Sequence, residues 1–285
     1  MAIDYEKLKG RDFAEIVHSY TQRDSIIYAL GVGFGYDPMD EQALPFVYED
    51  GIKAVPTLSA VLAYPGFWLK ESDTGVDWVK VVHAEQEIII HKPLPAEGTV
   101  AATTRVTEIV DKGEGRGAFI YSERTVRDKE TGEALCTLTQ TTMARGDGGF
   151  GGPAVSVEPP HQIPEREPDL QCDLPTLPQS ALLYRLSGDY NPLHASPAVA
   201  KSAGFKAPIL HGMCTFGVAG HAILKMCCDY DTARFHRIKG RFSKPVYPGE
   251  TIRTEIWREG DHVSFRCSVL ERDLVVINNG YAQVS

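Results

Sequence analysis

One order of short motifs occurs twice along the chain, once in each half. Three segments of the first half recur in the second: Ser25–Gly31 in Ser180–Ser187, Val55–Ala60 in Ala207–Gly212, and His91–Pro95 in Ser243–Tyr247. The offsets are 155, 152 and 152 residues. A single match of this length carries no weight, but three in the same order at nearly constant spacing indicate a duplicated domain. Two unrelated domains would leave the shared order unexplained.

Each half contains an apolar segment long enough for a helix, followed by segments rich in β-branched residues. The predicted helices cover Thr57–Leu69 and His211–Cys228. Gly212, Gly217 and Gly220 weaken a free helix but let a sheet approach closely. The predicted strands are Glu85–Ile90, Thr99–Val110, Gly117–Val126, Ala134–Ala144, Arg237–Phe242, Thr251–Arg258, His262–Leu270 and Leu274–Val284. We expect an α+β fold in which a sheet wraps a helix in each half, with a cavity between the halves.

The halves are separated by a segment of unusual composition. Residues 146–152 are rich in glycine, and residues 153–168 contain five prolines among acidic residues. This composition suits an extended connection and disfavours both helix and central strand. We therefore predict an N-terminal domain over residues 1–153, a linker over 154–176 and a C-terminal domain over 177–285.

Composition restricts the classes of partner. With 285 residues and 43% apolar content, the chain can bury one large core or two smaller ones. A net charge of −9 disfavours nucleic acid or an anionic membrane as the main partner. No apolar run approaches the ~20 residues that span a bilayer, and neither a signal peptide nor a C-terminal Ser-Lys-Leu is seen. The six cysteines lack metal-site spacing and indicate reduced thiols. These features predict a cytoplasmic protein.

The stretch Ser187–His194 carries the most suggestive chemistry. It places a carboxylate, an amide and an imidazole (Asp189, Asn191 and His194) within six residues, and Gly188 and Pro192 disfavour a helix there. Such a turn can direct its polar side chains into one pocket, although it can equally be a capped surface turn. In the first half, Gly33 stands at the position of Asp189 and Pro38 at that of His194, so both polar side chains are absent there. We therefore expect the second half to react and the first to accommodate a substrate.

Two long motifs resemble those of a known family. Tyr184–His194 and Pro208–Gly217 resemble the hydratase 2 motif of the MaoC-like (R)-specific enoyl-CoA hydratases, and the likeness covers nearly the whole chain. Its other segments are Arg23–Gly33, His83–Gln86, Asp111–Gly113, Gly148–Gly152 and Gly240–Thr251, in the two-domain layout of hydratase 2 units. The resemblance implies a double hot-dog fold and reversible hydration of trans-2-enoyl-CoA to (3R)-3-hydroxyacyl-CoA. It implies no metal and no cofactor apart from the CoA of the substrate.

Hydration of an enoyl thioester requires an activated water, a proton at C2 and a donor for the thioester oxygen. Asp189 and His194 can hold one water between them, which favours syn addition, but the sequence leaves open which of the two is the acid. Asn191 orients the water or stabilises the turn. Gly212 begins the predicted helix, where a free N–H favours an anion, and the family resemblance implies the same oxyanion role. The neighbouring His211 is expected to be structural.

The resemblance also implies substrate contacts. It assigns them to His83, Ala84, Lys112, Tyr190, Pro192, Leu193 and Phe242. Ala84 stands where many relatives have glycine. Lys112 suits a phosphate but is also an ordinary turn residue, Phe242 is an acyl-channel or a core residue, and residues 148–152 are a phosphate-binding loop or part of the linker.

Two other functions remain open at this point. Hot-dog proteins also include acyl-CoA thioesterases, and a non-catalytic acyl-CoA-binding protein would share the fold. The expected partner is an acyl-CoA thioester in each case, with neither nucleic acid nor membrane, and the expected assembly is a homodimer.

Overall fold

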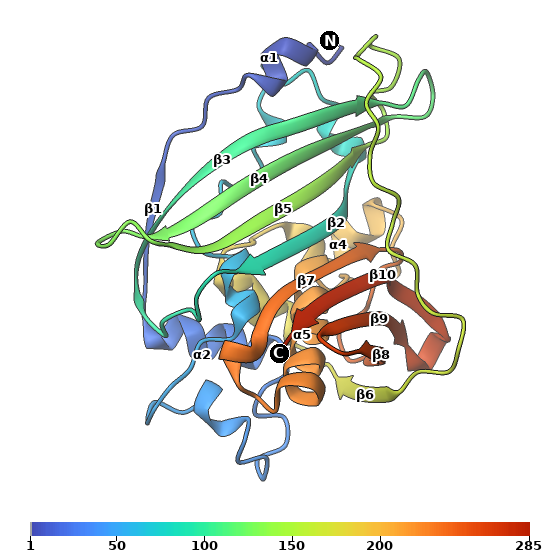
Figure 1. Ribbon diagram of the computed structural model, residues 1–285. Helices are drawn as coiled ribbons and strands as arrows, with labels where there is room; N and C mark the ends of the chain where they lie inside the picture. Colours follow the sequence, from blue (N-terminus) through green and yellow to red (C-terminus); the bar gives the residue numbers. More distant parts are fainter. Residues whose placement is uncertain (1) are drawn as a thin grey trace.

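The computed structural model describes residues 2–285, and its ten strands form one antiparallel sheet (Figure 1). The strand order is β1-β3-β4-β5-β2-β7-β10-β9-β8-β6, so each half contributes five neighbouring strands. The strands are β1 Ile16–Tyr20, β2 Val81–Ile90, β3 Gly98–Asp111, β4 Ala118–Asp128, β5 Ala134–Ala144, β6 Leu170–Pro175, β7 Phe235–Phe242, β8 Thr251–Glu259, β9 His262–Val269 and β10 Leu274–Val284.

The helices are few and mostly short. The α-helices are α1 Tyr5–Lys9, α2 Gln22–Gly31, α3 Ser180–Tyr184, α4 Pro197–Ser202 and α5 Gly212–Cys228. The 3-10 helices are η1 Leu44–Phe46, η2 Pro56–Ala60, η3 Trp68–Lys70, η4 Trp78–Lys80, η5 Arg185–Ser187, η6 Pro192–His194, η7 Thr232–Arg234 and η8 Leu270–Arg272. None of the helices in residues 2–285 is long and apolar enough to cross a membrane.

The α+β class and all eight predicted strands are confirmed, with ends that differ by a few residues. Two strands were not predicted, β1 and β6. Both are short edge strands that pair with one neighbour each, β1 with β3 and β6 with β8. Since β6 covers residues 170–175, the C-terminal part of the predicted linker 154–176 belongs to the sheet.

The two halves join where β2 pairs with β7. Glu85 lies opposite Arg241, and Ile88 lies opposite Ile238. Arg241 Nε is 2.8 Å from Glu85 Oε1, and Glu87 forms a second ion pair with Arg237. The paired charges and the central isoleucines fix the register, because a slip of one residue would exchange the two faces of the strand.

The second half encloses the predicted long helix. Helix α5 spans Gly212–Cys228 and is buried along nearly its whole length within the curve of strands β6–β10 (Figure 1). A helix that is apolar on all sides is stable only inside a core, which the surrounding sheet supplies. It ends at Asp229, whose left-handed φ of 51° stops the helix.

The equivalent helix of the first half, predicted over Thr57–Leu69, is wrong. Only the 3-10 turn η2 and the start of η3 form there, and between them Ala63 has a φ of 47° and Gly66 a φ of 71°. Pro65 explains the break, because a proline disfavours the α conformation of the preceding residue, here Tyr64. Among the described residues no central helix therefore fills the concave face of the first five strands.

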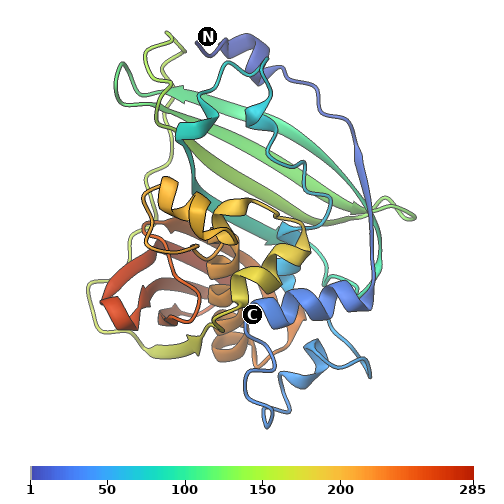
Figure 2. The ribbon, with the colours of Figure 1, turned by 180° about the vertical axis from the view of Figure 1, so that it is seen from behind.

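The duplicated motifs meet across the junction of the halves. Helices α2 and α3, which contain the paired Tyr28 and Tyr184, lie side by side (Figure 2). The two buried tyrosine rings have centroids 5.8 Å apart. Their contact continues the hydrophobic core from one half into the other.

Two glycines of α5, Gly217 and Gly220, face the first half and not the sheet as expected, whereas Gly212 faces Phe242 of β7. A Cβ on Gly217 would lie 2.5 Å from Cγ1 of Val32, and one on Gly220 would lie 2.6 Å from Cγ2 of Thr57. Both distances are shorter than a normal contact, so only glycine allows the helix to pack this closely. The six cysteines are all buried and free, as predicted.

We predict that Gly220→Ala lowers the free energy of unfolding by about 1–3 kcal/mol, because the added methyl overlaps Thr57. Helix propensity alone would raise stability by up to about 1 kcal/mol. Thr57→Ser removes the opposing Cγ2 and should restore most of the loss. Urea denaturation of both single variants and the double variant measures the coupling; independent effects in the double variant would contradict the close contact.

Candidate active site

The site turn follows directly from α3. Helix α3 continues into η5, which ends at Gly188 with a φ of 118°. The chain is then extended until η6, whose first turn contains Pro192. Asn191 Oδ1 accepts the N–H of Leu193 at 3.0 Å, and the carboxylate of Asp189 accepts the N–H of Asn191 at 3.1 Å. Asn191 thus has the turn-stabilising role that the sequence allowed.

Three ionisable side chains converge beside this turn. Asp189, His194 and His211 each offer a polar atom within 4.8 Å of the others. The imidazoles of His194 and His211 are stacked, with centroids 3.8 Å apart and planes inclined by 28°. The stacked rings and the carboxylate of Asp189 therefore form one compact polar cluster.

The hydrogen bonds of the two histidines define their tautomers. A carbonyl oxygen can only accept, so His194 Nδ1, 2.8 Å from the oxygen of Ile209, carries its proton. Nε2 of neutral His194 therefore keeps its lone pair. By the same argument His211 Nε2 donates to the backbone oxygen of Asp189 at 3.1 Å. His211 thus holds the main chain of Asp189 in place.

Burial keeps both rings neutral. His194 is 8% exposed and His211 is 1% exposed. Burial lowers the pKa of His194, and burial together with the stacked imidazole of His194, which disfavours a second positive charge beside it, lowers the pKa of His211 to about 4. His211 Nδ1 is buried without a hydrogen-bond partner in the structure. A base with a lowered pKa remains unprotonated near neutral pH and releases a captured proton readily.

Gly212 begins α5 next to His211. Within residues 2–285 no protein acceptor pairs with its N–H. The ring of Phe242 lies 3.5 Å from the position a Cβ would take on Gly212, and the ring of His83 is 4.8 Å from that of Phe242. Gly212, Phe242 and His83, predicted from three separate motifs, therefore lie together beside the turn.

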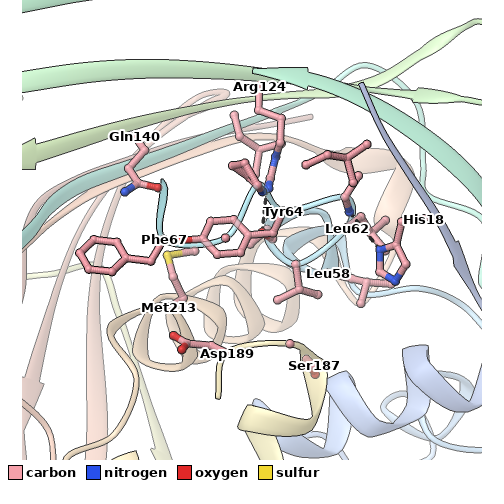
Figure 3. A pocket seen from close by; sticks show the side chains of 18 of the residues that line it. His18, Leu58, Leu62, Tyr64, Phe67, Arg124, Gln140, Ser187, Asp189 and Met213 are labelled. Atoms are coloured by element: carbon pink, nitrogen blue, oxygen red, sulfur yellow. Dashed lines mark hydrogen bonds between the residues drawn. The ribbon is translucent and has the colours of Figure 1, made fainter. Parts of the chain in front are cut away.

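A cavity of about 580 Å³ opens from this site over the concave face of the first half. Asp189 and Ser187 lie on one wall and Arg124 and Gln140 on the opposite wall, with Tyr64 between them (Figure 3). His83, Tyr190 and Met213 also line it. The cavity occupies the place that the missing helix of the first half would have filled.

Several predicted site residues are not part of the cavity wall; His194, Gly212 and Phe242 lie behind Asp189 and do not line it. Ala84 is the extra residue of a bulge in β2, where pairing with β5 shifts between His83 and Glu85. Lys112 places Nζ 4.8 Å from the ring centroid of Phe119. Pro192 and Leu193 form η6 and do not line the cavity either.

The glycine-rich segment before the linker is organised around a carboxylate. Asp111 accepts the N–H groups of Gly113, Gly149 and Gly151 at 2.7–2.8 Å. Gly149 and Gly151 already use their N–H groups in this way, so these two are not free for a phosphate.

The sequence missed the polar residues of the cavity wall. His18, Tyr64, Arg124 and Gln140 belong to β1, the irregular segment after η2, β4 and β5. One signal was available for Arg124. Ser122 and Arg124 lie between Ile120 and Val126 on the same face of β4, where a core-facing strand should be apolar throughout.

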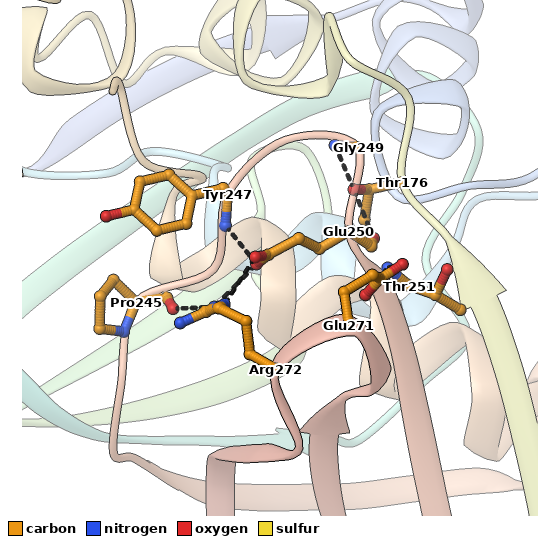
Figure 4. Close-up of polar contacts among 8 residues, drawn as sticks. All are labelled: Thr176, Pro245, Tyr247, Gly249, Glu250, Thr251, Glu271 and Arg272. Atoms are coloured by element: carbon orange, nitrogen blue, oxygen red, sulfur yellow. Dashed lines mark hydrogen bonds and ion pairs between the residues drawn. The ribbon is translucent and has the colours of Figure 1, made fainter. Parts of the chain in front are cut away.

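A polar cluster behind the site fixes the loop that leads to Gly212 (Figure 4). Glu250 accepts two hydrogen bonds from Arg272, at 2.6 and 2.7 Å, and one from the N–H of Tyr247. Arg272 also donates to the oxygen of Pro245. The turn held in this way gives its Val246 oxygen to the N–H of Leu210. The neighbouring Ile209 oxygen is the acceptor of His194, so the cluster supports the tautomer of that ring.

Comparison with known proteins identifies the family. Residues 18–146 match the MFE-2 hydratase 2 N-terminal domain and residues 160–279 match the MaoC like domain. The chain is 39% identical over 289 residues to the enoyl-CoA hydratase ChsH3 of Mycobacterium tuberculosis, with 98% of each chain covered. The chain belongs to the MaoC-like hydratase 2 family. It is also 38% identical to the peroxisomal enoyl-CoA hydratase 2 of Arabidopsis thaliana, covering 97% of this chain and 94% of that one.

Solved structures confirm the expected fold. A MaoC-like dehydratase from Phytophthora capsici superposes with a TM-score of 0.87 at 33% identity, covering 99% of this chain and 98% of that one. A Mycobacterium tuberculosis protein described as having a double hotdog fold gives a TM-score of 0.55 at 15% identity, with 99% and 98% covered. The protein therefore has the double hot-dog fold of this family, with the central helix of the first copy reduced to η2.

We predict opposite tautomers for the stacked histidines, with the proton on Nδ1 of His194 and on Nε2 of His211. Long-range ¹H–¹⁵N correlation spectra measure this directly, and His211→Gln identifies the signals of His211.

Because the folded-state pKa of His211, about 4, lies below the ordinary 6.5, the unfolded chain binds more protons between these values. His211 should therefore make stability fall as the pH drops from about 6.5, with a slope of at most about 1.4 kcal/mol per pH unit. Titration of His211 near pH 6.5 would contradict the buried, neutral ring.

Proposed function

We propose that this protein adds water reversibly across the double bond of a trans-2-enoyl-CoA to give the (3R)-3-hydroxyacyl-CoA. The observation that carries the proposal is the placement of Asp189 and His194 beside the unpaired N–H of Gly212. A water held between Asp189 and His194 supplies the hydroxyl group and the proton for C2. The N–H of Gly212 supplies the donor for the thioester oxygen. The enoyl-CoA hydratases and the MaoC-like dehydratase among its relatives support it.

The tautomer of His194 suggests how the proton moves. Water that lies between Asp189 and His194 donates one hydrogen bond to the carboxylate and one to the free Nε2 of the imidazole. As the oxygen bonds to C3, Nε2 takes the proton. The imidazolium, whose pKa is lowered by burial, then gives this proton to C2. Hydroxyl and proton come from the same side, so the addition is syn.

The start of α5 supplies the oxyanion site in this proposal. Charge develops on the thioester oxygen when C3 is attacked, and the N–H of Gly212 lies at the positive end of a 17-residue helix. Phe242 and His83 enclose this end, which keeps water away from the enolate. No step uses a metal or an organic cofactor, since the protein and the thioester provide every group required.

The remaining substrate contacts form part of the same proposal. Tyr190 and His83 line the cavity at the reacting end, while Ala84, Lys112, Pro192 and Leu193 lie outside it and are assigned to the CoA portion. The first half accommodates the acyl group. Homodimer formation and a cytoplasmic location stay predictions from the sequence.

We expect Asp189→Asn and His194→Gln each to lower kcat for enoyl-CoA hydration by roughly 10²–10⁴-fold, because each removes a proton acceptor of the water. The assay follows loss of the enoyl absorbance, with melting temperature as the measure of folding. Asn191→Ala is a matched control from the same turn, and its effect should be smaller. Thiol release by the wild type would indicate a thioesterase, and binding without turnover a non-catalytic acyl-CoA-binding protein.

Gly212→Ala tests the oxyanion site separately. The added Cβ meets Phe242 at an ordinary contact distance of 3.5 Å, so the variant should fold with an unchanged melting temperature. The methyl group would nevertheless obstruct the approach of the thioester oxygen to the N–H, and we expect kcat to fall roughly 10²-fold. A fully active Gly212→Ala variant would exclude this N–H as the oxyanion donor.

A further inference from the structure

The wall of the cavity that faces Asp189 contains a buried arginine with free donors. Arg124 projects from β4 into the cavity and is 7% exposed (Figure 3). Its Nη2 donates to the oxygen of Ala60 at 2.7 Å and to that of Ser59 at 3.4 Å. Nε and Nη1 are buried and have no hydrogen-bond partner in the structure. Three of the five guanidinium N–H groups are therefore unused.

The charge of Arg124 is also unpaired. No ion pair within residues 2–285 includes this arginine. The one acidic residue besides Asp189 that lines the cavity, Asp24, is hydrogen-bonded to the N–H and hydroxyl of Thr21. Burial lowers the pKa of Arg124 to about 10, so the side chain is still cationic near neutral pH. A buried cation without a counter-ion costs free energy, which an anionic ligand would offset.

The surroundings of Arg124 fit a group at the far end of an acyl chain. Tyr64 lies between Arg124 and Asp189, with its ring centroid 5.4 Å from the guanidinium carbon (Figure 3). Tyr64 as a whole is 43% exposed and lines the cavity, so its ring lies between the guanidinium and the open space. His18 adds a second donor to the cavity, because its Nδ1 accepts the N–H of Ala63 at 3.0 Å and its Nε2 therefore carries the proton.

We propose that Arg124 binds a carboxylate at the distal end of the acyl group, so that the substrates include ω-carboxy-trans-2-enoyl-CoA thioesters. This inference rests on the hydratase function proposed above. The thioester reacts at Asp189 and His194, and the acyl chain crosses the cavity past Tyr64 to the guanidinium. Leu58, Leu62 and Leu138 line the path, which suits the methylene groups between the two ends. A phosphate of CoA, doubly charged and strongly hydrated, suits this enclosed wall less well.

The test compares two trans-2-enoyl-CoA series of matched chain lengths, one ending in a methyl group and one in a carboxylate. At its best length, the wild type should hydrate the carboxylated substrate with the higher kcat/KM. Arg124→Met should lower kcat/KM for that substrate roughly 10²-fold, since hydrogen bonds to a charged group are lost. It should leave the methyl-terminated substrate within about threefold. Arg124→Lys should restore part of the preference by keeping the charge.

Three results would overturn the proposal. One is a wild type that prefers the methyl-terminated series at every length. Another is an equal loss for both series in Arg124→Met, which would mean that the arginine only supports Ala60. The third is that Arg124→Met lowers kcat/KM for CoA thioesters but not for pantetheine thioesters, which lack the phosphates of the nucleotide. That result would assign Arg124 to a CoA phosphate. If Arg124→Met does not fold, competition of saturated carboxylated and methylated acyl-CoA for the wild type decides the same question.

The outcome for the proposed function is read separately. If the wild type hydrates neither series, the hydratase function fails. Calorimetric binding of the saturated carboxylated acyl-CoA to wild type and Arg124→Met then tests Arg124 by itself.

Discussion

The antiparallel pairing of β2 with β7 is the contact on which the rest of the structure depends. It unites the two copies in one sheet and sets Glu85 opposite Arg241. The same register brings the beginning of β2, with His83, next to the end of β7, with Phe242. The bulge at Ala84 changes the alternation of β2 at this point. A site composed of residues from both copies therefore follows from one strand pair, and neither copy alone could form it.

Duplication made much of this architecture predictable. Strand segments with alternating β-branched residues were found because that signal is local, and α5 was found because an apolar run of its length has few alternatives. The turn Ser187–His194 was recognisable because glycine and proline restrict its backbone. The edge strands β1 and β6 were not predicted, because their pairing depends on partners distant in the sequence, which a local pattern does not reveal.

The wrong helix in the first copy is the more instructive difference. The apolar residues of Thr57–Leu69 satisfy the pattern of a helix, but Pro65 and Gly66 break it. Its remaining turn η2 packs against Gly220 of α5, and Tyr28 donates its hydroxyl hydrogen to the oxygen of Thr57. The first copy thus lacks a central helix, and α5 of the other copy packs against the short turn that stands in its place. The cavity lies where that helix would be, so the break at Pro65 and Gly66 marks the place where the two copies differ.

The two ends of the cavity differ in how burial acts on their charges. Behind the Asp189 end, burial keeps His194 and His211 neutral, and the polar atoms of the three side chains lie within 4.8 Å of one another. At the opposite wall, burial cannot neutralise Arg124, because a guanidinium remains protonated even with its pKa lowered to about 10. A histidine can respond to an enclosed site by releasing its proton, whereas an arginine requires an anion. Because the protein places no anion beside Arg124, the proposed partner of this arginine is a carboxylate on the acyl chain itself.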